Sequence, residues 1–431
     1  LGELTLNGEN TYTGETAITG GTLRVGTDSS STGNLASGTD VDISSGATLE
    51  LLNHETVASI KGGGNINLNS FNLTSGEGNE NTIFSGLISG TGGLVKNGAG
   101  TLELSGANTY TGTTQLQKGT LRLTGSAASN VNSSIQKTSS DLASLSVDTI
   151  SDVSIDADIV STGSNLDVEV KAAGKIVLKD GHSIESKGGD IVLWSNTGNV
   201  SSGTGEHFIL LESGTSITSS GGKIVLAGGS DTDSDGYPDG YAYIGNSVVP
   251  FGSTYGANPL QPGLSLGSLR NQTGSRITIQ SDGGDIIMRG RSGADYSESD
   301  GFGSQRAVVI DSGTGSVHIE GDQTSSSGGV GLRFGGFAYY PDIAISSDST
   351  SSPAITIIGS SADHYGIWLG QGNTNPDFAG TVLVQSSATT GGGINIEGST
   401  AKTTDSRAIA LWGDETRGFT TYQCLSNHGD I

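Results

Sequence analysis

Short runs in which apolar and polar residues alternate recur along most of this chain, and glycine, serine or asparagine separates them. The stretch 100–123 shows the pattern best, because Leu102 and Leu104 alternate with polar residues, as do Leu121 and Leu123. Alternation with a period of two predicts strands with one buried face. Further short strands are expected at 109–111 and 114–116, with tight glycine turns between them. The chain is therefore predicted to be all-β.

The same pattern occurs twice. Residues 2–26 match residues 100–124 at 14 of 25 positions, with an offset of 98. The shared elements are a Gly-x-Leu-x-Leu start, an Asn-Thr-Tyr-Thr-Gly middle and a Gly-Thr-Leu-Arg end. Three short strands with glycine corners over about 25 residues are what one coil of a solenoid requires. We therefore predict stacked coils that supply each other's strand partners.

This repeat resembles the autotransporter-associated β-strand repeat of secreted bacterial passenger proteins. The resemblance covers only the two short segments that carry the motifs. It implies a right-handed parallel β-helix, export across an outer membrane through a translocator barrel, and an adhesive or scaffolding role at the cell surface. The repeat brings no catalytic residues with it.

The chain divides into three predicted regions. Residues 1–125 contain the autotransporter-type repeats, and the Ser/Ala/Asn-rich segment 126–150 is interpreted as a linker or an inter-coil loop. Residues 151–431 carry looser repeats: a Gly-Gly pair precedes an apolar run, and the related runs 317–321, 355–359 and 394–398 follow at spacings of 38 and 39 residues. This part resembles filamentous-haemagglutinin-like exoproteins. Four of the seven prolines lie in 229–270, and because proline cannot donate to a strand ladder, we predict a long protruding loop there.

Composition narrows the classes of partner. The net charge of −24 disfavours nucleic acids and anionic membranes, both of which require basic surfaces. No apolar run approaches the roughly 20 residues of a membrane-spanning helix, so direct membrane insertion is not expected. The chain starts within a repeat at Leu1, which is expected of an internal piece of a longer protein. Its single cysteine, Cys424, is compatible with export as an unfolded chain.

An acidic segment in the predicted loop is the candidate metal site. Its proposed ligands occupy positions 1, 3, 5 and 9 of a calcium-loop pattern, with glycine at position 6: Asp231, Asp233, Asp235 and Asp239. The twelfth position is Ala242, where such a loop places a bidentate glutamate. Calcium is therefore the candidate cofactor, and a solvated acidic turn is the alternative.

Two functions remain open from the sequence. The first is a non-enzymatic extracellular adhesin or stalk that binds glycans or matrix proteins of a host or a neighbouring cell. The alternative is a β-helical polysaccharide lyase or hydrolase, which needs carboxylates and bases together on one face. The mixed cluster nominated for that chemistry is Asp285, Arg289, Arg291 and Asp295. Aromatic residues of the loop, including Tyr241 and Tyr243, are expected to pack against the strands, with ligand contact as the alternative.

Overall fold

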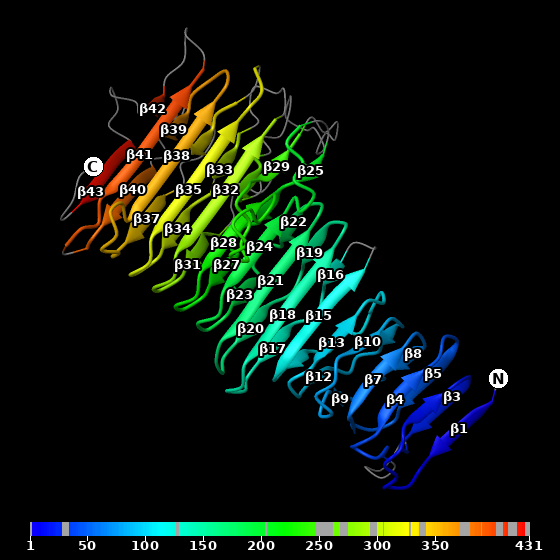
Figure 1. Ribbon diagram of the computed structural model, residues 1–431. Helices are drawn as coiled ribbons and strands as arrows, with labels where there is room; N and C mark the ends of the chain where they lie inside the picture. The colour runs from blue at the N-terminus through cyan, green and yellow to red at the C-terminus, as the bar shows by residue number, and fades with distance from the viewer. Residues whose placement is uncertain are drawn as a thin grey trace. The chain divides into compact units, whose positions relative to one another are not determined.

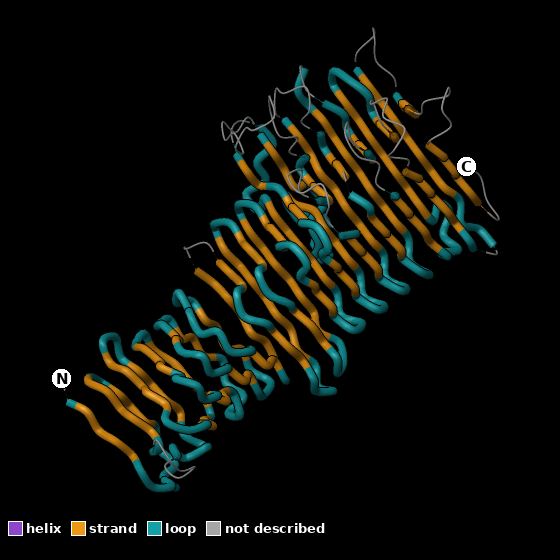
Figure 2. Tube along the Cα trace, turned by 180° about the vertical axis from the view of Figure 1, so that it is seen from behind, coloured by secondary structure: helices purple, strands orange, loops and turns teal. Residues whose placement is uncertain are grey.

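The computed structural model contains strands joined by short loops. It describes residues 2–27, 34–125, 129–202, 205–245, 262–267, 275–293, 300–304, 306–326, 329–335, 342–370, 380–388, 390–401, 408–412 and 420–426. No helix occurs in these ranges, and none of them offers a helix that could cross a membrane. Figure 2 shows strands alternating with the loops that form the corners of successive coils. The chain separates into two compact units, residues 1–150 with 156–169, and residues 151–155 with 170–431.

Unit 1 is built from three walls of parallel strands (Figure 1). Wall 1A contains β2 (Thr16–Ile18), β4 (Asp40–Ile43), β7 (Ser59–Gly62), β10 (Thr82–Phe84), β13 (Thr101–Leu104), β15 (Gly119–Gly125) and β18 (Ala143–Thr149). Wall 1B contains β6 (Glu55–Val57), β9 (Leu73–Ser75), β12 (Leu94–Lys96), β14 (Thr114–Leu116), β17 (Ile135–Lys137) and β20 (Ile159–Ser161). Wall 1C contains β1 (Glu3–Leu6), β3 (Gly21–Val25), β5 (Ala47–Leu51), β8 (Asn65–Asn67) and β11 (Ile88–Ser89). The strand β16 (Ser129–Val131) follows β15, and β21 (Leu166–Ala172) contains residues of both units.

Unit 2 also has three walls. Wall 2A contains β24 (Ile191–Ser195), β28 (Ile224–Gly228), β32 (Ile286–Ser292), β35 (Val317–Gln323), β38 (Ile355–Ser361) and β41 (Ile394–Thr400), with β25 (Glu206–His207) and β29 (Ala242–Ile244) beside it. Wall 2B contains β23 (Ser183–Glu185), β27 (Ser216–Thr218), β31 (Ile277–Gln280), β34 (Val308–Asp311), β37 (Ile343–Ser347), β40 (Gly380–Ser386) and β43 (Thr420–Ser426). Wall 2C contains β19 (Val153–Ile155), β22 (Ile176–Leu178), β26 (Ile209–Leu211), β30 (Leu264–Leu266), β33 (Phe302–Ser304), β36 (Leu332–Phe334), β39 (Ile367–Gly370) and β42 (Ile409–Trp412).

The core of each unit is a set of ladders in which similar apolar side chains stack from coil to coil. In unit 1, Leu102, Leu121 and Leu145 are register partners, and each is at most 2% exposed. In unit 2, Met288 and Ile319 are register partners and are fully buried. Outward positions between these residues are polar, so alternation assigns every second residue to the core. The predicted all-β parallel β-helix is confirmed.

The Gly-Gly pairs are corners, as predicted. In four successive coils a buried serine hydroxyl donates to the carbonyl oxygen of the glycine three residues later: Ser186 to Gly189, Ser219 to Gly222, Ser281 to Gly284 and Ser312 to Gly315. The residue after the serine adopts a positive φ in all four corners. In the first three corners the next residue is the first glycine of the Gly-Gly pair, which also has a positive φ. Because the buried hydroxyl at each corner is hydrogen-bonded within its own coil, burying it costs little free energy.

Within the segment interpreted as a linker or inter-coil loop, the described residues 129–150 contain three strands, β16, β17 and β18. The seven residues of β18 pair with β15 in parallel, and the side chains of Ala143, Leu145, Val147 and Thr149 are buried. The Ser/Ala/Asn-rich composition suggested a linker, but the serines of β18 occupy outward positions, where polar residues are expected in a strand. The remaining boundaries of the three predicted regions stay a prediction.

The shared repeat forms a coil with two strands rather than three. Leu4 pairs with Leu23 and Leu102 pairs with Leu121, so each copy closes a coil in 19 residues. In the second copy the chain passes from β13 through β14 to β15 and adds no strand to wall 1C. The expected strand at 109–111 is therefore wrong. The segment is a corner, in which the side-chain oxygen of Asn108 accepts a hydrogen bond from the Ile88 amide.

Candidate functional site

The candidate site lies in the first half of the predicted loop, which is not a free protrusion. We call residues 229–245 the flap. The flap leaves wall 2A at Gly229, crosses the outer face of that wall and returns as β29, which pairs in parallel with β32. Further along, β30 is a buried strand of wall 2C that pairs with β26 and β33. The prediction of one long loop over 229–270 is thus corrected for the described parts, and residues 246–261 and 268–270 lie outside the described residues.

The strands beneath the flap explain why it packs down. In β24 and β28 every side chain is buried, including the outward-facing Val192, Trp194 and Val225. These residues form an apolar cluster that Tyr237 of the flap covers. A strand buried on both faces has a continuous apolar sequence rather than an alternating one. The run Ile-Val-Leu-Trp at 191–194 is therefore the sequence signal that this wall is covered.

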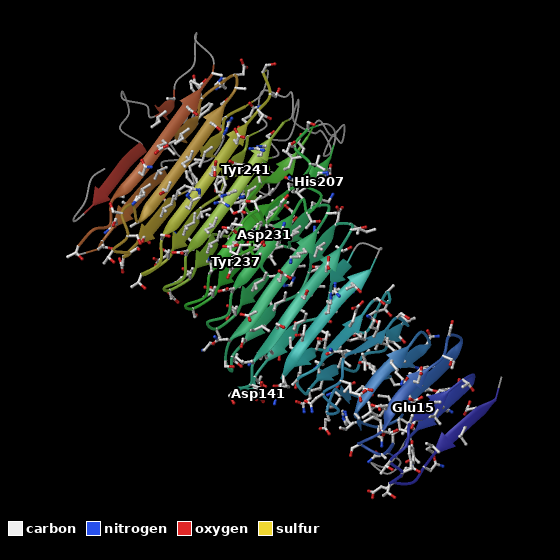
Figure 3. All side chains as sticks on the ribbon, viewed as in Figure 1. Glu15, Asp141, His207, Asp231, Tyr237 and Tyr241 are labelled. Atoms are coloured by element: carbon white, nitrogen blue, oxygen red, sulfur yellow. The ribbon has the colours of Figure 1, made fainter. Side chains whose placement is uncertain are left out.

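Polar contacts fix the N-terminal half of the flap. The Trp194 indole donates to the Gly229 carbonyl oxygen at 2.7 Å. The Tyr237 hydroxyl donates to Asp190, and the Lys223 ammonium lies 4.0 Å from the centre of the Tyr237 ring. Figure 3 labels Asp231, Tyr237 and Tyr241 on this part of unit 2. Because these contacts join the flap to two different coils, they hold its backbone against the wall.

The C-terminal half of the flap is anchored by aromatic residues, as the sequence predicted for Tyr241 and Tyr243. The Tyr241 hydroxyl donates to Glu320, and the Arg291 guanidinium lies 4.0 Å from the centre of the Tyr241 ring. Tyr243 is 1% exposed and stacks on the ring of His207. Burial and the Glu320 carboxylate both raise the pKa of Tyr241. Both tyrosines therefore pack against neighbouring strands of unit 2, as predicted.

Three of the four predicted calcium ligands come together at the tip of the flap. Asp231, Asp233 and Asp239 each place one carboxylate oxygen within 4.8 Å of the other two. Asp235 lies outside this group, and its carboxylate accepts a hydrogen bond from the Tyr237 amide at 2.9 Å. Position 12 of the pattern, Ala242, is a buried residue of β29 and offers no carboxylate.

Backbone amides hold the carboxylates in place. Asp231 accepts hydrogen bonds from the amides of Ser234 at 2.7 Å and Gly236 at 3.0 Å. Asp239 accepts from both the amide and the hydroxyl of Thr232, and these hydrogen bonds, led by the one from the hydroxyl, lower the pKa of Asp239. The sharp turn predicted at position 6 is present, because Gly236 has a φ of 92°. Asp239 is therefore ionised at neutral pH, and two backbone amides orient the Asp231 carboxylate.

The described residues nominated for enzymatic chemistry contact residues of the neighbouring coil. Asp285 accepts from the amide and hydroxyl of Ser316, each at 2.8 Å. Arg291 pairs with Asp322 at 2.7 Å, and Arg289 with Glu320 at 3.6 Å, in each case across neighbouring strands. Asp295 lies outside the described residues. Arg289 and Arg291 therefore both lie against the Tyr241–Glu320 pair, whereas Asp285 is engaged separately by Ser316.

Comparisons with known proteins agree with the repeats. The family model of the passenger-associated-transport-repeat matches residues 1–25 and 94–123. These two segments carry the passenger-associated transport repeat. It is 32% identical over 207 residues, 46% of its length, to the adhesin BmaC autotransporter of Brucella suis biovar 1 (strain 1330). It is 61% identical over 44 residues, 10% of its length, to an extracellular serine protease of Serratia marcescens.

The aligned stretches span only 6% of the Brucella adhesin and 4% of the Serratia protease. No solved structure matches the chain. The passenger repeats, together with the similarity to an autotransporter adhesin, confirm the predicted autotransporter resemblance and the predicted localisation, which is extracellular and at the bacterial cell surface.

Proposed function

We propose that this chain is a non-enzymatic adhesive segment of a secreted passenger protein, exported through an outer-membrane translocator barrel. The observation that carries the proposal is the 207-residue similarity to an autotransporter adhesin, which extends well beyond the two repeats. The similarity to the serine protease is confined to 44 residues and gives no reason to transfer proteolysis.

The flap is the part of the chain proposed to contact a partner. Residues 232–236 at its tip are exposed, whereas its base is anchored to wall 2A by Trp194, Tyr237 and Tyr241. A short exposed tip on a rigid base loses little conformational entropy on binding. The ligands proposed for it are host or neighbouring-cell glycans or matrix proteins, and the regular coils act as the spacer that presents it.

Calcium is proposed to bind at the tip, held by Asp231, Asp233 and Asp239. Hard carboxylate oxygens are the ligands that calcium prefers, and three of them already lie within 4.8 Å of one another. A bound cation would neutralise the repulsion among the three neighbouring carboxylates. The bound ion would stiffen the surface offered to a partner.

A calorimetric titration tests the metal proposal. Calcium is titrated into the purified chain and into Asp231→Asn and Asp239→Asn, with Asp235→Asn as the matched control, because Asp235 carries the same charge but lies outside the group. We expect binding in the parent chain and in the control, and at least about a tenfold weaker affinity in the other two variants. Absence of binding at about 1 mM calcium, or equal loss in all three variants, removes the site.

Binding of the chain to glycan arrays and immobilised matrix proteins, with calcium and with chelator, tests the adhesive role. Specific binding that Asp231→Asn or chelation weakens supports the flap as the contact surface. Failure to bind at micromolar protein would make this segment a spacer. The alternative, a β-helical lyase or hydrolase, predicts release of oligosaccharides from acidic or neutral polysaccharides. The distribution of Asp285, Arg289 and Arg291 among ladder contacts weighs against it.

A further inference from the structure

A cavity of about 260 Å³ opens in unit 1 at the second copy of the repeat. Its position follows from the two-strand coil, because residues 105–113 contribute no strand to wall 1C. The segment still follows β11 through the hydrogen bonds from the Thr109 amide to the Ile88 carbonyl and from the Thr111 amide to the Gly90 carbonyl. It therefore forms one side of an opening in the wall, and β16 forms the other.

The cavity reaches the hydrophobic core. Leu123 points inward, and its register neighbours Leu104 and Val147 are 2% and 0% exposed. Leu123 itself is only half-buried, because its inner side lines the cavity. A core leucine left open to solvent costs free energy in proportion to its exposed apolar area. A ligand that covers Leu123 would recover that free energy.

The lining combines an apolar floor with a polar rim and carries no charged side chain. Leucine, valine and isoleucine side chains, including Leu104 and Leu123, form the floor, and polar side chains, including the amides of Asn130 and Asn132, surround it. The absence of charge in this lining contrasts with the 44 acidic residues of the whole chain. A charged ligand would lose its hydration without gaining an opposite charge, so the lining selects against it.

Tyr110 gives the cavity an aromatic side. It is 7% exposed, and its hydroxyl shares a 2.6 Å hydrogen bond with Thr114. The equivalent Tyr12 in the first copy makes the same hydrogen bond with Thr16 at 2.7 Å, but Tyr12 is 38% exposed. The repeat motif therefore fixes the tyrosine in both copies, and only the second copy encloses it.

From this lining we infer that the cavity is a binding site for a neutral pyranose ring. The ring's C–H face lies against Leu123 and Tyr110, and its hydroxyls exchange hydrogen bonds with the rim amides of Asn130 and Asn132. A cavity slightly below the roughly 300 Å³ of the smallest typical ligand pockets suits one or two sugar rings. The site is separate from the flap and does not depend on the adhesive role proposed for it.

Ligand-observed NMR and calorimetry with the purified chain test the inference. The probes are methyl glycosides of neutral hexoses and N-acetylhexosamines, with free sialic acid as the charged comparison. Asn132→Ala removes a rim amide and Leu123→Phe fills the floor. Gln136→Ala, an exposed residue of the neighbouring strand β17 that does not line the cavity, is the control.

We expect a neutral glycoside to bind, sialic acid not to bind, and affinity to fall at least about tenfold in Asn132→Ala and Leu123→Phe but not in Gln136→Ala. Thermal unfolding of each variant verifies that the fold is retained, and Asn132→Ala, at an exposed position, keeps the test valid if Leu123→Phe unfolds. Lack of binding to every neutral glycoside at about 10 mM, preference for the charged sugar, or unchanged affinity in Asn132→Ala overturns the inference. None of these results bears on calcium binding by the flap.

Discussion

Replacing Lys96 with methionine is predicted to change how the stability of unit 1 depends on pH. Lys96 is 1% exposed and faces inward from β12. Its ammonium donates to the carbonyl oxygens of Asn97 and Gly98, each at 2.8 Å, and of Lys118 at 3.1 Å. Burial outweighs these contacts and lowers the pKa of Lys96 from 10.5 to about 8. Because one pKa unit corresponds to about 1.4 kcal/mol, this shift represents a destabilisation of the charged form in the folded state by at most about 3 kcal/mol.

The sign follows from proton binding. Between pH 8 and pH 10.5 the unfolded chain holds a proton on Lys96 that the folded chain has released, so this residue makes stability rise with pH across that window. Below pH 8 both states are protonated, and the contribution is constant. Lys96→Met has no titratable group at this position, so its free energy of unfolding lacks this increase with pH.

Urea unfolding of the two proteins between about pH 7 and pH 11, followed by circular dichroism, measures the effect. The free energy of unfolding of the parent minus that of Lys96→Met is expected to grow by up to about 3 kcal/mol across the window. Lys61→Met is the control with the opposite sign, because the hydrogen bond to Glu15 raises the pKa of Lys61. A constant difference for Lys96→Met would refute the assignment of a buried, destabilised ammonium.

Three further predictions test the packing of buried groups. Burial raises the pKa of Glu55 from 4.5 to about 7. Between these values the folded chain holds a proton that the unfolded chain has released, so the free energy of unfolding falls as pH rises through this window. Above pH 7 we therefore expect Glu55→Gln to be up to about 3 kcal/mol more stable than the parent in urea unfolding. A Cβ on Gly86 would lie 1.6 Å from the Gly64 carbonyl oxygen, so Gly86→Ala should lower the thermal midpoint, whereas Gly20→Ala, with open space around it, should not. Arg333→Met leaves the buried Asp300 carboxylate unpaired and should cost about 3–5 kcal/mol in denaturant unfolding, most of which Asp300→Leu restores in the double variant.

Much of the fold follows from the sequence because the same two signals recur in several coils. Alternation assigns Leu102 and Leu121 to the core, and the Gly-Gly pairs mark corners in which the first glycine adopts a positive φ. The corner at 108–110 escapes this reasoning. Thr109, Tyr110 and Thr111 have high β-propensity, but the Asn108 cap and the Tyr110–Thr114 hydrogen bond make the segment turn.

The candidate site is predicted in part. Spacing alone identifies Asp231, Asp233 and Asp239, whereas the exclusion of Asp235 depends on which carboxylates the backbone amides orient. The packing of the flap could have been anticipated from the unbroken apolar runs of β24 and β28. The cavity could not, because it arises from a strand that one coil omits, and no single residue encodes that omission.

The parallel ladders also determine how each unit responds to force. Hydrogen bonds between neighbouring coils run along the stack, so tension applied to the ends of a unit loads the rows of bonds in series rather than side by side. The end coil then peels away first, and its resistance is set by its own few short strands. Adding coils therefore extends the reach of the protein without raising or lowering the force at which it begins to open.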